Sequence, residues 1–299
     1  MPLTTDFVAA VRRQGSIPST TSAADILAEG DLCIVDDFVP LLEELRQNYF
    51  IREMTVSPDG RGRIAIPPRA VGATVRSVQL ALQGGWVPLA QRDLADADYV
   101  ANGPFPDGFA IDGGSIILLP TGSSGTLRLR YPARPGKMVL DTDANNAGRI
   151  DSLVPGATTY TITTSPVFTG GSIIDVVSYG PAHQQKCLTA TRAGLVLQQS
   201  DFLETPVVGD WLCTFDTSPF VPLPEELYGA LVHATAANLL LARGYLAEAA
   251  AQQATAKDKV LQAKKFLIPR LEGNPKTVSG GLRRSMGSTG RATWRGRWW

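Results

Sequence analysis

Residues 222–269 read PLPEELYGALVHATAANLLLARGYLAEAAAQQATAKDKVLQAKKFLIP, and this stretch carries the strongest helical signal in the chain. Pro222 and Pro224 stand just before Glu225 and Glu226, an arrangement that starts a helix because the acids complement its dipole. Gly244 either divides the stretch into two helices or bends a single one. Apolar side chains recur at the three- and four-residue spacing of a helix face: Leu227, Leu231, Ala234, Leu241 and Tyr245, then Leu246, Ala249, Ala256, Val260, Ala263 and Leu267.

Many of these recurring residues are alanines, and small side chains let two helices approach closely. The neighbouring helix can belong to the same chain, as in a packed hairpin, or to another copy of the protein. The sequence leaves both interpretations open, and we expect residues 222–272 to be helical in either case.

The first 55 residues are also expected to be helical. Phe7, Val8 and Val11 form a short amphipathic pattern. Ser22 and Asp25 then have the spacing of a capping box, which starts a second helix. A longer apolar face follows, and Gly30 and Pro40 are expected to interrupt it. The acidic pairs Asp36-Asp37 and Glu43-Glu44 are expected on solvated helix surfaces.

Between these helical ends, residues 56–221 change to a period of two, which indicates half-buried strands. Turn signals such as Asp59-Gly60 and Pro106-Asp107-Gly108 punctuate the region. We expect the fold class to be α+β, with the N- and C-terminal helices forming one helical domain and a large antiparallel β domain inserted between them. The expected strands lie at 63–66, 75–80, 115–119, 126–131, 172–179, 195–199 and 210–215.

Residues 273–299 have a different composition and are expected to form an extended arm. This segment holds six basic residues and no acid, so the other 272 residues hold 22 basic and 28 acidic ones. Six glycines make it costly to order, and arginine and tryptophan are the residues most enriched at binding hot spots. We therefore expect it to bind the partner or a neighbouring subunit through Arg283, Arg284, Arg291, Trp294, Arg295, Arg297, Trp298 and Trp299. Contact with nucleic acid, or a disordered end without a partner, is the alternative.

The sequence does not indicate catalysis. Cys33, Cys187 and Cys213 are widely spaced in apolar surroundings, which is typical of reduced core residues and not of a metal cluster. The only histidines, His183 and His233, have no neighbour that suggests a catalytic group. Neither a signal peptide nor an apolar run of about 18 residues is present, so we expect a cytosol-like compartment and no membrane.

One loop superficially resembles a calcium site. Residues 141–151, DTDANNAGRID, supply several oxygen ligands, but the glycine falls at the eighth position of the loop instead of the sixth. Position twelve is Ser152 where a glutamate would be needed. We expect an Asx-rich surface loop, and we expect no catalytic residue, cofactor or metal.

Three phrases of the sequence carry a resemblance to the head-to-tail adaptor, or connector, proteins of tailed bacteriophages. Residues 64–78, IAIPPRAVGATVRSV, are similar to that family's recurring I-P-x-R-A-x-G-x-x-x-R-x-V stretch. Residues 106–120 and 126–135 resemble its β-domain core. Residues 222–231 resemble the start of its C-terminal helices. The β region is large for an adaptor, which suggests an additional role such as docking a fibre or tail tube.

The resemblance implies a structural virion protein at the head-tail junction, assembled in the host cytoplasm, and not an enzyme. It implies a homo-oligomeric ring, a dodecamer, which binds the portal protein, extends the DNA channel and docks a downstream tail protein such as a nozzle, tube or fibre. Packaged DNA would pass without specific binding, which fits an acidic body. The alternative function is a fibre-associated or carbohydrate-binding β module of the phage tail.

Overall fold

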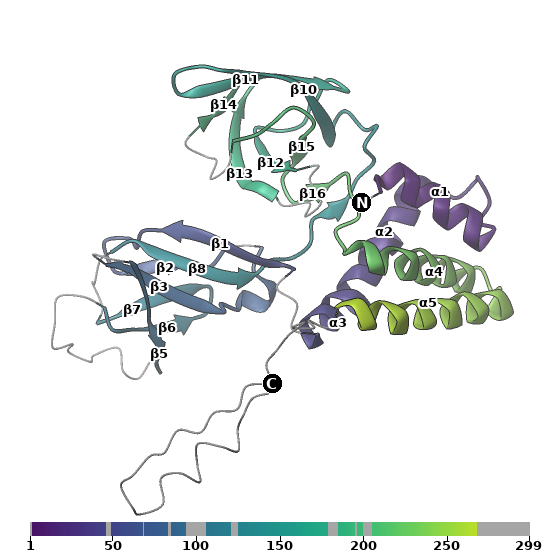
Figure 1. The fold of residues 1–299 in the computed structure, drawn as a ribbon, viewed down its shortest axis with the longest axis horizontal. Coiled ribbons are helices and arrows are strands. Elements are labelled where there is room, and N and C mark those ends of the chain that lie inside the picture. The colour runs from purple at the N-terminus through teal and green to yellow at the C-terminus, as the bar shows by residue number, and fades with distance from the viewer. Residues whose placement is uncertain are drawn as a thin grey trace, which may run out of the picture.

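The computed structural model describes residues 2–45, 49–67, 69–82, 85–93, 106–120, 125–178, 185–194, 196–199 and 205–267. The protein is a mixed α+β protein with helices toward both ends and strands between them (Figure 1). The helices are α1 (Thr4–Gly15), α2 (Ala23–Cys33), the π-helix η1 (Ile34–Phe38), α3 (Val39–Glu44), the short 3-10 helix η2 (Val71–Ala73), α4 (Glu225–Ala242) and α5 (Leu246–Leu267).

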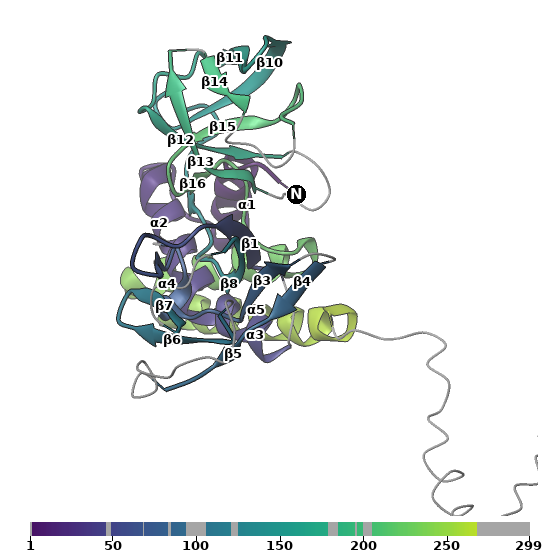
Figure 2. The same cartoon turned by 90° about the vertical axis from the view of Figure 1, so that its left-hand side faces the viewer.

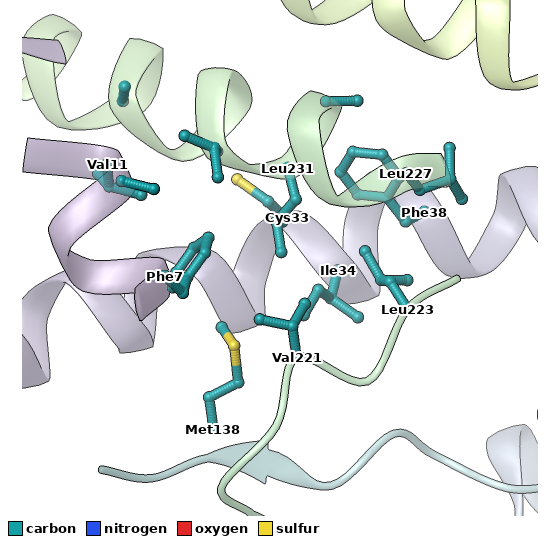
Figure 3. Close-up of a cluster of buried hydrophobic side chains, with 14 of the residues drawn as sticks. Phe7, Val11, Cys33, Ile34, Phe38, Met138, Val221, Leu223, Leu227 and Leu231 are labelled. Atoms are coloured by element: carbon teal, nitrogen blue, oxygen red, sulfur yellow. The ribbon is translucent and has the colours of Figure 1, made fainter. Parts of the chain in front are cut away.

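The helices from the two ends of the chain share one hydrophobic core. Figure 3 shows Phe7 and Val11 of α1 facing Cys33 and Ile34 from α2 and η1, with Leu231 of α4 above them. Burying such side chains removes apolar surface from water, at about 25 cal/mol per Å². These five residues are 0 to 2% exposed. The core therefore ties the N-terminal helices to the C-terminal hairpin, although about 180 residues separate them in the sequence.

The helix boundaries confirm some of the expected signals and correct others. The Ser22 hydroxyl accepts a hydrogen bond from the Asp25 amide, so the predicted cap is present. Gly244 divides the C-terminal stretch, since α4 and α5 form a hairpin around its positive φ of 83°. Pro40 stands at the start of α3, directly after the π-helical turn.

Gly30 was expected to interrupt a helix, and this prediction was wrong. It lies inside α2, where a Cβ would come within 2.6 Å of the Met138 side chain and 3.0 Å of Phe7. A close approach of three segments thus explains the glycine better than a helix break does. The prediction of one apolar helix face in the C-terminal stretch was also wrong in part. Leu241, Tyr245 and Leu246 belong to that predicted face but are each more than half exposed at the hairpin.

The first β body is a sandwich of two four-stranded sheets, and both sheets contribute to one core that includes Val78, Leu129 and Ile116. One sheet has the order β1-β8-β3-β4 and the other the order β2-β7-β6-β5. The strands are β1 (Ile51–Val56), β2 (Arg63–Ala65), β3 (Ser77–Leu82), β4 (Gly85–Pro88), β5 (Ala90–Gln91), β6 (Gly108–Asp112), β7 (Ser115–Leu119) and β8 (Leu127–Pro132).

The second β body is a closed six-stranded barrel with the order β10-β11-β14-β13-β12-β15 and a separate core around Ile150, Ile162 and Leu212. Its strands are β10 (Ala147–Pro155), β11 (Thr159–Ser165), β12 (Ile173–Val177), β13 (Gln185–Ala193), β14 (Val196–Gln198) and β15 (Trp211–Thr214). The strands expected to form one β domain therefore divide between two cores. Two parallel pairs, β5 with β6 and β9 (Lys137–Met138) with β16 (Thr217–Ser218), also depart from the expected antiparallel pattern.

The two β bodies both adjoin the helices but occupy different places (Figures 1 and 2). The sandwich begins and ends at one point, since the Ala133 amide donates to the Phe50 carbonyl at 2.9 Å. The barrel does the same, because the Thr214 amide donates to Asn146 at 3.0 Å. The linker between the bodies returns to the helical core, where Met138 is buried.

Candidate interaction surface

The residues predicted to bind a partner all lie outside the described residues. This holds for Arg283, Arg284, Arg291, Trp294, Arg295, Arg297, Trp298 and Trp299, and also for His183. The side chain of Cys187 is likewise outside the described part, whereas Cys33 and Cys213 are buried free thiols. The described candidate site is therefore the surface that such a segment, or another protein, can meet.

The described polar clusters have structural partners. In the described part of the chain, no group of three or more His, Cys, Asp or Glu side chains could hold a metal ion. His233 Nδ1 lies 2.6 Å from Gln252 Oε1, so this histidine joins α4 to α5.

The loop at residues 141–151 is only partly the surface loop that we expected. Asp143 makes an Asx turn with the amide of Asn145, as its composition indicates. Asp141, however, is buried, and its carboxylate accepts hydrogen bonds from the Thr5 amide and the Thr4 hydroxyl at the start of α1. The loop thus attaches the barrel to the helical core.

The helical domain leaves large apolar side chains in contact with solvent. Phe266 is 77% exposed and Leu261 is 59% exposed, both on α5. The other such side chains of this domain are Leu32, Val35, Leu241, Tyr245 and Leu246. These side chains are distributed over α2, η1 and both ends of the α4–α5 hairpin, and exposed apolar surface of this kind favours contact with another protein where it is contiguous.

A groove of about 440 Å³ runs between η1 and α3 on one side and α5 on the other, above α4. Phe38 and Leu41 line the first wall, and Val260 and Leu261 line the second. Ala234, Ala237 and Ala256 lie in the same groove, and their small side chains keep it open. The alanines of α4 and α5 therefore serve the intrachain hairpin, and some of them also shape a surface that remains available.

Asp37 is the acidic residue among those that line the groove, and Lys257 and Lys264 line its α5 wall. Asp36 and Asp37 are both exposed, and neither has an ion-pair partner within the described ranges. Burial and the neighbouring Asp36 raise the pKa of Asp37. Glu44 of α3 lies 3.6 Å from Lys264 of α5, which itself lines the groove. A cationic group would be favoured at Asp36 and Asp37.

A buried charged cluster joins the two β bodies. Arg69, in the loop after β2, is 2.8 Å from Asp175 of β12 and 2.7 Å from Asp216. The Asp175 side chain is fully buried, and its second carboxylate oxygen has no hydrogen-bond partner among the described residues. Burial raises the pKa of Asp175 to about 7, although Arg69 opposes the shift.

Asp31 makes a comparable attachment between α2 and the linker. Both of its carboxylate oxygens accept from the Met138 amide, at 3.0 and 3.1 Å. Burial raises the pKa of Asp31 to about 7, while the bond from Met138 and the charge of Lys137 act in the opposite direction.

Sequence reasoning missed both attachments. Asp175 stands inside the apolar strand Ile-Ile-Asp-Val-Val, and a charged residue within such a run is the signal that could have revealed a buried ion pair. Its partner could not be found from the sequence alone, because Arg69 lies 106 positions away.

No family model and no curated protein matches this sequence. Across the described residues, no helix has both the length and the apolar content that crossing a membrane requires. The proposals below therefore depend on the surface and the buried attachments described above.

Proposed function

We propose that this protein is a structural component of a phage virion, a head-to-tail adaptor that forms a ring on the portal protein and docks a downstream tail protein. The observation that carries the proposal is the exposed apolar surface of the helical domain, on α2, η1 and the α4–α5 hairpin. In a ring, one face of each subunit meets a different face of its neighbour. Such a contact requires apolar side chains that are exposed in the isolated subunit, as Phe266 and Leu246 are.

The attachments of the β bodies support the same function. Arg69 joins the sandwich to the barrel, while Asp31 and Asp141 fix the linker to the helices. Rigid placement suits a ring subunit, because a fixed angle between contact faces is what makes a ring close. In this proposal the β bodies present surfaces to tail components, and packaged DNA passes without specific binding.

The alternative, a carbohydrate-binding or fibre-associated β module, needs exposed aromatic side chains on the β bodies. Among the large apolar side chains that are exposed in the described part of these bodies, Phe215 is the aromatic one, at 39%. Phe215 also packs against Arg69, whose guanidinium carbon lies 5.6 Å from the ring centre. Within the described residues, the β bodies thus offer no exposed aromatic cluster that would favour this alternative.

The proposal is tested by producing the full chain together with the portal protein of the same phage and imaging the complex by electron microscopy. We expect a second ring, formed by this chain, at the exit of the portal. A permanent contact of this kind buries on the order of 2,000 Å² or more. Portal particles without added density, together with a chain that stays monomeric in the mixture, would refute the proposal.

A further inference from the structure

We propose that the groove between η1–α3 and α5 binds the C-terminal end of this chain, residues 294–299, with the sequence Trp-Arg-Gly-Arg-Trp-Trp. The proposal rests on the groove and on this sequence, and it does not depend on the adaptor function.

The groove has the size and lining that aromatic side chains need. Its volume of about 440 Å³ lies within the range of roughly 300 to 1,000 Å³ that is typical of ligand-binding clefts. Phe38, Leu41 and Val260 supply apolar walls, and Leu261 remains 59% exposed beside them. An indole ring, which buries about 150 to 250 Å² in a good site, would cover the exposed part of this lining.

The charges of the η1 side of the groove and of the segment are complementary, whereas Lys257 and Lys264 line the α5 wall. Asp37 lines the η1 wall and Asp36 is its neighbour on η1, and neither pairs with a cation among the described residues. Arg295 and Arg297 alternate with the tryptophans, so an extended segment can place rings in the groove and guanidinium groups at its edge. Charge-assisted pairs of arginine with carboxylate are among the stronger hydrogen bonds and would orient the segment.

The course of the chain makes the groove accessible to this segment. Helix α5 ends at Leu267, one turn after Lys264, which lines the groove and meets Glu44 of α3. The 32 residues after Leu267 can span up to about 100 Å when extended, at roughly 3.3 Å per residue. The C-terminal end can therefore return to the groove of its own chain or reach that of an adjacent copy.

Photo-crosslinking of the full-length protein tests this proposal. The variant Trp298→p-benzoylphenylalanine is irradiated, digested and analysed by mass spectrometry, which identifies the residues that the probe contacts. We expect crosslinks to the lining of η1, α3 and α5, within residues 37–41 and 253–264. A crosslinked product of monomer size shows binding within the chain, and one of dimer size shows binding to a second copy. Both support the groove as the site.

Charge reversal at the groove supplies the matched control. The variant Asp36→Lys/Asp37→Lys should lower the groove crosslinks at least about fivefold, since two exposed ion pairs are replaced by repulsion. Asp112→Lys/Asp151→Lys makes the same charge change at exposed positions of the β bodies and should leave them unaltered. Leu261→Lys tests the same groove through one exposed side chain, should the double variant fold poorly. Crosslinks that map elsewhere, or that respond equally to both double variants, would overturn the proposal.

Discussion

Replacing Arg69 by methionine should release the barrel from the sandwich in a manner that depends on pH. Arg69 is 4% exposed, and its guanidinium faces Asp175, which is fully buried. Removing one partner of a buried ion pair costs about 3 to 5 kcal/mol, because the other charge is left without compensation. At pH 8.5 we expect this loss in the free energy of opening for strands β12 and β15. Their amide protection should then fall by a factor of about 10² to 10⁴.

At pH 5.5 the loss should be smaller. The pKa of Asp175 is raised to about 7, so this carboxyl is already protonated at pH 5.5 and Arg69 no longer neutralises its charge. What remains is mainly the loss of hydrogen bonds, about 1 to 2 kcal/mol. The expected difference between the two pH values is therefore about 2 to 3 kcal/mol, the charge-dependent part of the buried pair.

Hydrogen exchange measured by mass spectrometry resolves the barrel strands from those of the sandwich, after correction for the intrinsic effect of pH. Arg63→Met is the control, since Arg63 is exposed on β2 and its loss should change stability by less than about 0.5 kcal/mol. A loss below about 1 kcal/mol at pH 8.5, or an equal loss at both pH values, would show that Arg69 does not compensate a buried charge.

Three further predictions concern other parts of the chain. The pKa of Asp31 is about 7 in the folded protein and near 3.8 when unfolded, so folding takes up a proton between these values and the free energy of unfolding rises as pH falls from 8 to 5. Asp31→Asn should remove on the order of 2 kcal/mol of that rise in denaturant titrations, and an unchanged slope would contradict it. Leu231→Ala, in the fully buried core, should cost about 2 to 5 kcal/mol in the same assay, whereas Leu261→Ala should cost less than about 0.5, so similar losses would contradict the burial pattern. Deleting residues 276–299 should leave a soluble, folded monomer that no longer attaches to the portal in a pull-down, and undiminished attachment would show that the arm is dispensable.

Local signals in the sequence predicted the helices and most strands well. The cap at Ser22 and the prolines before Glu225 act within a few residues, and the structure contains both features where they were expected. The alternating segment at 126–131 corresponds to β8, and the apolar run at 115–119 corresponds to β7. Periodicity reports which face of an element is buried but not what buries it.

Long-range contacts explain what the sequence could not predict. The division of the strands between a sandwich and a barrel depends on pairings such as β10 with β15, more than 60 residues apart. Gly30 was misjudged because its reason is the approach of Met138, a residue of the distant linker. The groove was not expected either, since it arises only when η1, α3, α4 and α5 meet.

The adjacent ends of each β body have an evolutionary consequence. The chain enters the sandwich after Phe50 and leaves it at Ala133. It enters the barrel after Asn146 and leaves it at Thr214. A backbone hydrogen bond joins the two residues of each pair. Each body is thus an insertion whose two ends are adjacent, and domain insertion is best tolerated where the two ends lie close together. Either body can change in length or in its outer strands while its two ends stay fixed to the helices. Lineages that share these helices can therefore differ widely in length and in surface, even where their sequences have diverged beyond alignment.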